Sequence, residues 1–102
     1  MVISTAPVDV ASVLARQLVE ERLAACVNIV PRVRSIYRWQ GEIQDDAESM
    51  LVIKTVERAV DQLTSRLVEL HPYDVPEVIS LELREGEGNA AYLDWVRENV
   101  SI

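Results

Sequence analysis

The sequence predicts one α+β domain over residues 1–102, and three observations support this fold class. Segments in which apolar and polar residues alternate, a pattern typical of β-strands, flank segments in which apolar residues recur every three to four positions, as in amphipathic helices. Residues 50–53 are apolar at every position, which indicates a strand buried on both faces. A chain of 102 residues has room for little more than one hydrophobic core.

The N-terminal third predicts a strand, a helix and a second strand. Val2–Ser4 is short, rich in β-branched residues and soon followed by a proline. Residues 9–24 predict a helix, because apolar residues recur at four-residue steps after Asp9, which is a favourable N-cap residue. Residues 26–30 predict the next strand, which we expect Pro31 to end.

A long hairpin is predicted over residues 33–55. Residues 40–42 include a glycine and indicate a bulge or turn that bends the long strand, and Asp45 and Asp46 should form an acidic tip. Residues 50–53 lie in the returning strand. The first strand alternates with period two, so one face should carry four of its side chains: Val33, Ser35, Tyr37 and Trp39.

The rest of the chain predicts a helix, a strand and a last helix. Thr55 can cap the first of these helices, which should end at His71 because a proline follows. Its apolar stripe is uninterrupted: Val56, Val60, Leu63, Leu67 and Leu70. Residues 77–84 alternate as a strand, and Asn89 can cap a C-terminal helix after two glycines.

This order of elements predicts the ferredoxin-like βαββαβ arrangement: a four-stranded antiparallel sheet, a long hairpin of the second and third strands, and an extra C-terminal helix. The first and third strands should be central, with both main helices on one face. The other face should be polar in a monomer, yet residues 50–53 present apolar side chains to both faces. Because 49% of the residues are apolar despite a net charge of −7, we expect a homo-oligomer.

Composition and motifs exclude several function classes. A net charge of −7 argues against nucleic-acid binding, which needs a basic face. No apolar run approaches the roughly 20 residues of a membrane-spanning helix. The N-terminus lacks the features of a secretory signal, and the one cysteine cannot form an internal disulfide, so we expect a cytoplasmic protein. Phosphate-binding, HExxH and nucleophile-elbow motifs are missing, which predicts that the chain is not an enzyme.

The segment from His71 to Glu77 is the candidate metal site. An imidazole and carboxylates together suit Cu²⁺ or Zn²⁺, so His71, Asp74 and Glu77 could bind a divalent cation. Three or four ligands are needed for tight binding, so others would come from elsewhere or from another subunit. The alternative is that His71 only stabilises the negative end of the preceding helix.

Two further residues could carry chemistry. Lys54 is the only lysine and follows a strand predicted to be buried, so it needs either a carboxylate partner, such as Glu77, or a bound anion. Cys26 lies in an apolar strand with no basic neighbour in sequence, and we expect it to be a buried core residue.

Every aromatic side chain carries a polar group, since the chain has two tryptophans, three tyrosines and no phenylalanine. This combination is typical of interfaces and clefts, and a role in stacking on a ligand is the narrower alternative. The residues concerned are Tyr37, Trp39, Tyr73, Tyr92 and Trp95.

Five segments, taken in order, resemble the CutA divalent-cation tolerance family over essentially the whole chain. They are Ala24–Pro31, Ser35–Gly41, Ile53–Thr55, His71–Glu77 and Tyr92–Trp95.

The resemblance implies a cytoplasmic homotrimer, similar to the PII signalling proteins, that is associated with tolerance to copper and other divalent metals. It implies that the hairpins pair between subunits and that the open sheet faces pack together. Of the positions at which the family's proposed copper ligands stand, here Ser4, Leu70 and His71, only His71 matches. The resemblance also implies an inter-subunit cleft, lined by residues drawn from Tyr37, Trp39, Lys54, Tyr73 and Trp95.

Three hypotheses follow. The first is a trimeric, non-enzymatic tolerance protein that binds a divalent cation weakly, with no cofactor required for folding. The second is a PII-like sensor that binds a small anionic metabolite near Lys54, with Tyr37 or Trp39 stacking on it. The third is a structural scaffold.

Overall fold

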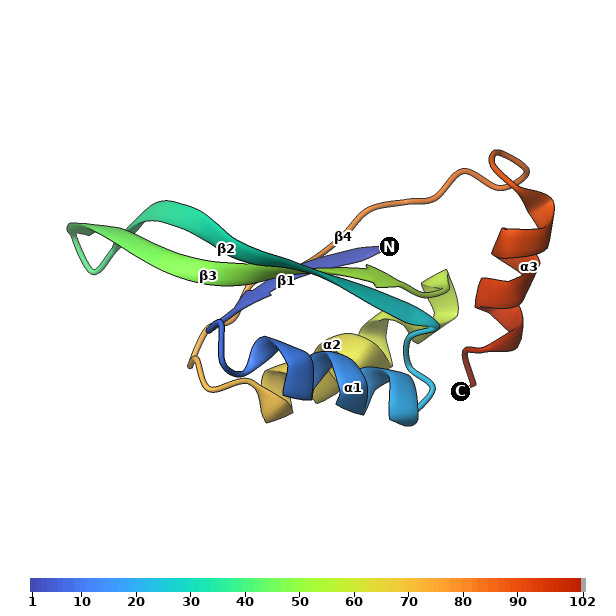
Figure 1. Cartoon of the computed structure of the whole chain (residues 1–102), viewed down its shortest axis with the longest axis horizontal. Coiled ribbons are helices and arrows are strands. Elements are labelled where there is room, and N and C mark those ends of the chain that lie inside the picture. Colours follow the sequence, from blue (N-terminus) through green and yellow to red (C-terminus); the bar gives the residue numbers. More distant parts are fainter. Residues whose placement is uncertain (102) are drawn as a thin grey trace.

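The computed structural model describes residues 1–101 and contains one four-stranded sheet and three helices (Figure 1). A short 3₁₀ turn, Glu57–Ala59, precedes the second helix. The elements in chain order are β1 (Val2–Ala6), α1 (Ala11–Glu20), β2 (Cys26–Trp39), β3 (Glu42–Lys54), α2 (Val60–Leu70), β4 (Val78–Ser80) and α3 (Ala90–Glu98).

The sheet confirms the predicted topology. Its strand order is β2-β3-β1-β4 and all of its pairings are antiparallel, so β1 and β3 are central. Helices α1 and α2 lie together on one face of the sheet, and the opposite face carries no helix in this view (Figure 1). In the described part of the chain, no helix is long and apolar enough to cross a membrane.

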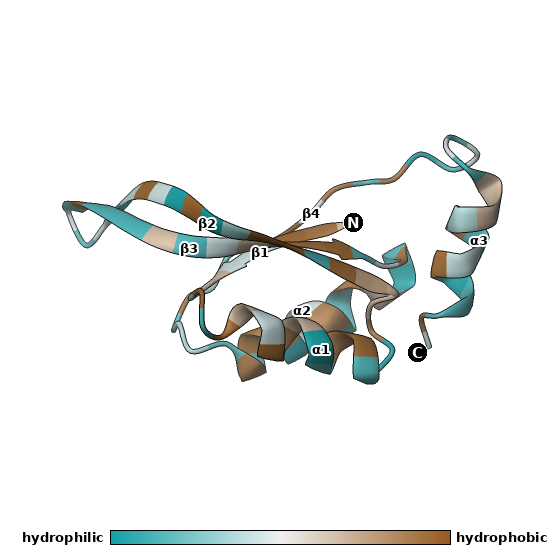
Figure 2. Ribbon diagram, viewed as in Figure 1, coloured by the Kyte–Doolittle hydropathy of each residue, from teal (hydrophilic) through white to brown (hydrophobic). Residues whose placement is uncertain are grey.

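The hydrophobic core lies between the sheet and the two helices. Leu51 and Ile53 of β3 point toward the helices and are fully buried, while Met50 and Val52 point to the open face and are half-buried. Figure 2 shows mainly hydrophobic residues where strands β1, β2 and β3 overlap in this view. Full burial of one such side chain stabilises a fold by roughly 1.5–3 kcal/mol. The core is completed from the helices by Leu14, Leu18, Leu63 and Leu67.

The hairpin of β2 and β3 is longer than predicted, because Pro31 does not end the strand. Its turn lies at residues 40–41, and the predicted tip at Asp45 and Asp46 is wrong because both residues lie within β3 and pair with β2. Strand β2 continues through Pro31 to Trp39, with a bulge between Val30 and Val33 at which Arg32 adopts a φ of 56°. Since β2 is at the edge of the sheet, the missing N–H of Pro31 costs no pairing in the interior. The molecule measures 44 × 25 × 21 Å, and the hairpin extends along the longest axis beyond the helices (Figure 1).

Both predicted caps of the main helices are wrong. Helix α1 begins at Ala11, and no side chain caps it; the backbone N–H of Ala11 instead donates to the Pro7 carbonyl (3.1 Å). It ends at Glu20, because Arg22 turns the chain with a φ of 58°. The hydroxyl of Thr55 donates to the Leu23 carbonyl (2.7 Å) and therefore ties the end of β3 to the loop before β2.

The last strand is shorter than the alternation predicted. Strand β4 is Val78–Ser80, and one further backbone hydrogen bond joins Leu81 to the Met1 carbonyl (2.7 Å). The chain then leaves β1 and runs to α3. Asn89 caps α3 as predicted, since its side-chain oxygen accepts from the Ala91 N–H (3.1 Å). Helix α3 packs against the loop before β2 and the 3₁₀ turn through a second small cluster: Ala25, Ala59, Val96 and Val100.

Candidate functional site

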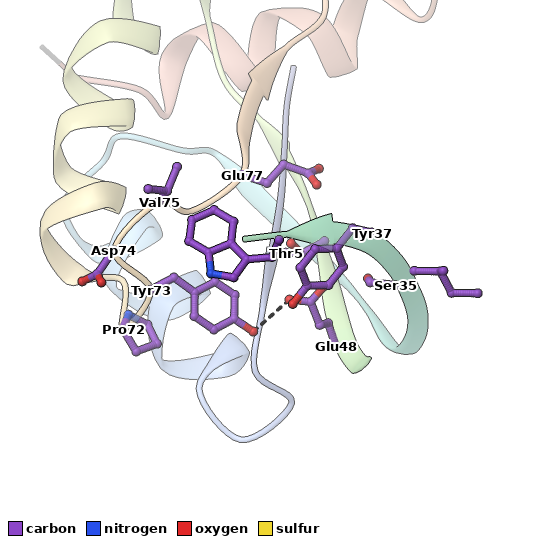
Figure 3. A pocket seen from close by; sticks show the side chains of 11 residues that line it. Thr5, Ser35, Tyr37, Glu48, Pro72, Tyr73, Asp74, Val75 and Glu77 are labelled. Atoms are coloured by element: carbon purple, nitrogen blue, oxygen red, sulfur yellow. Dashed lines mark hydrogen bonds between the residues drawn. The ribbon is translucent and has the colours of Figure 1, made fainter. Parts of the chain in front are cut away.

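A cleft of about 720 Å³ opens between the hairpin and the segment that joins α2 to β4. We call this segment, residues 72–77, the cleft loop. Figure 3 shows its side chains and those of the hairpin around one cavity. The lining residues are Thr5, Ser35, Ile36, Tyr37, Trp39, Glu48, Pro72, Tyr73, Asp74, Val75 and Glu77.

His71 fixes the start of the cleft loop. It follows α2 in an extended conformation (φ −74°, ψ 140°), as expected of a residue before proline. Its Nδ1 accepts from the backbone N–H of Tyr73 (3.1 Å), which places the ring proton on Nε2, and Nε2 donates to the Thr5 carbonyl (2.8 Å). The imidazole is 7% exposed, so it joins the loop to β1 from inside the fold.

A hydrogen bond joins the cleft loop to the hairpin. The Tyr73 hydroxyl donates to Oε1 of Glu48 (2.8 Å), as Figure 3 shows. Glu48 is only 6% exposed, and burial together with this bond raises the pKa of the Tyr73 hydroxyl above its ordinary value of 10.0. At the other end of the loop, the Ser4 hydroxyl donates to the Glu77 carbonyl (2.7 Å). The loop is therefore held at both ends and at its tyrosine.

Tyr37 is held in the same way on the hairpin itself. Its hydroxyl donates to Asp46 (2.6 Å), and this bond, with a smaller contribution from burial, raises the pKa of the Tyr37 hydroxyl. Both cleft tyrosines therefore stay neutral at physiological pH and use their hydroxyls on carboxylates. Their rings remain accessible, with 42% of Tyr37 and 38% of Tyr73 exposed.

The charge of the cleft is entirely negative. Glu48, Asp74 and Glu77 line it, whereas none of the chain's ten lysines and arginines is among the lining residues within the range 1–101. On the hairpin, Arg34 is neutralised by its own pair, because it donates to Asp45 (2.8 Å). An arrangement of carboxylates without cations attracts cations and repels anions.

The structure brings together only part of the predicted metal site. Asp74 and Glu77 line the cleft, but both ring nitrogens of His71 are used by internal hydrogen bonds. Across residues 1–101, no three His, Cys, Asp or Glu side chains are grouped as a metal site. His71 therefore orients the loop that carries the two carboxylates.

Lys54 and Trp95 do not lie in the cleft. Lys54 ends β3 opposite Cys26, and its ammonium donates to the side chain of Asn28. The predicted pair of Lys54 with Glu77 is wrong, since Glu77 precedes β4 at the other end of the sheet. Trp95 lies on α3 and packs against Tyr92, with ring centroids 5.5 Å apart.

The prediction that Cys26 is a buried core residue is also wrong. Cys26 begins β2 and is half-buried near α3. It contributes to the raised pKa of the Tyr92 hydroxyl, for which burial is the larger cause. Cys26 is only half-buried because the end of an edge strand is covered on one side only, even where the neighbouring residues are apolar.

Sequence reasoning missed Glu48, the most buried acid of the cleft. A signal was available: with the turn at residues 40–41, antiparallel pairing places Tyr37 opposite Gln44, Ser35 opposite Asp46 and Val33 opposite Glu48. Directly opposed residues share a face of the hairpin, so the face of Tyr37 is also that of Glu48. The contributions of Thr5 and Val75 had no such signal, because they depend on how the loop folds onto β1.

The fold and the cleft define a class: small ferredoxin-like α+β proteins with a protruding β2–β3 hairpin and a C-terminal helix. Within that class, the family model described as "CutA1 divalent ion tolerance protein" matches residues 1–99. The chain belongs to this family, which is non-enzymatic, in agreement with the prediction from its motifs.

Relatives and solved structures agree with this assignment. The divalent-cation tolerance protein CutA of Thermus thermophilus is 56% identical over 91 residues, which are 89% of this chain and 86% of that protein. A solved structure of the divalent cation tolerance protein from the same organism superposes with a TM-score of 0.92, at 53% identity and coverages of 98% and 96%. The PII-like protein CutA from Nostoc sp. PCC 7120, in apo form, gives 0.93 at 36% identity, with coverages of 98% and 95%.

A human relative extends the comparison to eukaryotes. Protein CutA of Homo sapiens is 48% identical over 89 residues, which are 87% of this chain but 49% of that protein. The chain therefore spans about half of the human protein's length.

Proposed function

We propose that this chain is a divalent-cation tolerance protein that acts as a cytoplasmic homotrimer and binds a divalent cation weakly at the carboxylate side of the cleft. The observation that carries the proposal is the charge of the cleft, where Glu48, Asp74 and Glu77 have no basic neighbour among the lining residues described in 1–101. Membership in a divalent-ion tolerance family supports the same kind of ligand.

The ligands in this proposal are Asp74 and Glu77, and His71 positions the loop that carries them. Both carboxylates are exposed in the single chain, and hydrogen bonds anchor the backbone of the cleft loop that carries them. Oxygen ligands bind many divalent ions, and affinity at a given site rises along the first-row series to Cu²⁺. Copper and zinc are therefore the ions to test first, with weak binding expected because few ligands come from one chain.

The trimer is proposed to cover apolar surface that one chain leaves exposed. A monomer seldom exposes a large contiguous apolar surface. Here exposed apolar residues outside the cleft occur on the open face of the sheet and after β4: Val30, Ile79, Leu81 and Leu83. We expect two further copies of the chain to cover them, and sedimentation at micromolar concentration tests this; a monomer would contradict it.

The anionic-metabolite hypothesis has less support from the geometry. It requires Lys54 and an aromatic side chain of the hairpin to contact one ligand in a cleft between subunits. Lys54 does not line the cleft of its own chain, so it would have to come from another copy. A scaffold role predicts no ligand at all.

Calorimetric titration with Cu²⁺ and Zn²⁺ tests the metal proposal. Replacing both ligands (Asp74→Asn with Glu77→Gln) should weaken binding by about tenfold or more, the loss of roughly 1.4 kcal/mol. The control is Asp9→Asn with Glu98→Gln, which removes the same charge from exposed positions outside the cleft. Equal affinity in both double variants would contradict the assignment of Asp74 and Glu77.

A single replacement, His71→Gln, separates positioning from ligation. If His71 only positions the loop, the metal affinity of the variant should fall only moderately, because Asp74 and Glu77 remain in place. A loss as large as that of the double variant of Asp74 and Glu77 would instead identify His71 as a ligand.

A further inference from the structure

The cleft contains more apolar surface than a metal ion can use. Its volume of about 720 Å³ lies within the roughly 300–1,000 Å³ of small-molecule sites. Three of the chain's five aromatic side chains line it, namely Tyr37, Trp39 and Tyr73, together with Ile36 and Val75. A hydrated metal ion contacts carboxylates and leaves such surface unused, so the lining indicates a ligand with an apolar body.

The aromatic rings present faces that attract cations. An indole or phenol ring carries negative charge density on its face, and cations bind there within about 6 Å of the ring centroid. Hydrogen bonds to Asp46 and Glu48 orient both phenol rings, while Trp39 is 46% exposed. Rings held in place lose little conformational freedom on binding, which favours affinity.

Glu48 supplies a buried acceptor in the wall of the cleft. Its side chain is more than nine-tenths buried, and Oε1 accepts from Tyr73. Its second oxygen receives no hydrogen bond from the residues described in 1–101 and is not fully shielded, because no fully shielded side-chain oxygen there lacks a partner. Glu48 itself is one of the residues that line the cleft. A carboxylate oxygen in this position favours a positively charged group beside it.

We infer that the cleft binds an organic ammonium ion: a cationic nitrogen close to Glu48, with its alkyl part against Tyr73 and Trp39. The inference rests on the proposed function in one respect, that the cleft stays open to cations in the assembled protein. It differs in the ligand, because rings and apolar side chains recognise an alkyl cation and contribute nothing to a bare metal ion. The absence of a basic lining residue in 1–101 makes an anionic ligand unfavourable.

The two tryptophans provide a direct test. Trp39 lines the cleft and Trp95 lies on α3, so their indole N–H signals in NMR report on the two ends of the molecule separately. Choline and 1,4-diaminobutane are the probes, and 3,3-dimethylbutan-1-ol is the neutral analogue of choline. We expect a saturable shift of the Trp39 signal with at least one cation, none with the alcohol and none for Trp95.

Variants distinguish this inference from the metal proposal. Trp39→Leu removes the ring and should weaken calorimetric binding of the organic cation at least threefold, whereas Trp39→Phe should keep part of it. Neither change should alter Cu²⁺ or Zn²⁺ affinity, which depends on Asp74 and Glu77. Equal binding of choline and its neutral analogue, or no response to either cation while the metals still bind, would overturn the inference and leave the metal proposal intact. If the wild-type protein binds the organic cation but neither metal, the metal proposal is overturned and the inference stands.

Discussion

Strand β3 passes through two environments that differ in what holds them together. From Ser49 to Ile53 it lies between β1 and β2 above two helices, and Leu51 and Ile53 are fully buried. From Glu42 to Ala47 it pairs with β2 alone, and nearly all of its residues are exposed. The first part is stabilised by burial of apolar surface, the second by backbone pairing and by side-chain pairs such as Arg34 with Asp45.

The comparison shows where the candidate site can form. A helix-covered sheet has no room for a ligand on its inner face, whereas the hairpin projects past α1 and α2 and leaves one side open to the cleft loop (Figure 1). Glu48 lies at the boundary between the two regions, buried like the core but hydrogen-bonded to the loop. The body therefore supplies rigidity, and the hairpin supplies the accessible groups.

The largest expected difference is between apolar truncations in the two regions. Leu51→Ala, in the body, should lower the free energy of unfolding by about 2–5 kcal/mol because it leaves a cavity. Ile43→Ala, at a hairpin position that is 61% exposed, should change the chain's own stability by no more than about 0.5 kcal/mol. Denaturant unfolding at a fixed protein concentration measures both. Equal losses would mean that Ile43 is as buried in the assembled protein as Leu51.

A smaller difference in stability is expected when the hydroxyl of one or the other cleft tyrosine is removed. Tyr73→Phe leaves an oxygen of the buried Glu48 without its donor and should cost about 1–3 kcal/mol. Tyr37→Phe removes a bond to the exposed Asp46 and should cost no more than about 0.5 kcal/mol. Thermal unfolding compares them, and amide exchange of the cleft loop should increase only in Tyr73→Phe. The same cost for both would show that the loop is not held through Glu48.

The smallest expected effect concerns how the free energy of unfolding decreases at low pH. Hydrogen bonds from Arg66 and then Gln17 lower the pKa of Glu21, in the body, below its ordinary value of 4.5, and a bond from Arg34 lowers that of Asp45, in the hairpin, below 3.8. A carboxyl with a depressed folded pKa stabilises the native state above its unfolded pKa, and this contribution is lost as the pH falls through the folded pKa.

The pair in the body should give the larger acid dependence, because it is less exposed to screening solvent. The side chains of Arg66 and Glu21 are 32% and 29% exposed, against 74% and 45% for Arg34 and Asp45. Between pH 6 and pH 2, the free energy of unfolding should therefore depend less on pH in both variants than in the wild type, and the reduction should be larger in Glu21→Gln than in Asp45→Asn. High salt should make both reductions smaller. A larger change in Asp45→Asn would show that the hairpin pair is shielded in the assembled protein.

The sequence predicted the strands, helices and strand order correctly because hydrophobic periodicity is a local signal. The sequence-based predictions failed where the role of a residue depends on which side of its strand or helix is covered by another element. Pro31 was expected to end a strand, but an edge strand tolerates it; Thr55 was expected to cap a helix, but its hydroxyl bonds across to Leu23. The Lys54–Glu77 pair failed for a related reason, since residues equally suited by charge lie at opposite ends of the sheet.

By itself, the sequence determined the fold, the excess of apolar surface and the cluster from His71 to Glu77, all of which depend on residue type and spacing along the chain. Only the tertiary structure decided what the cluster does. It turns His71 inward onto Thr5, leaves Asp74 and Glu77 at the cleft, and adds Glu48 and the hairpin aromatics from a segment more than twenty residues away in sequence. A ligand site depends on distances in space between groups from several elements, and those distances are set when the hairpin and the loop pack against β1.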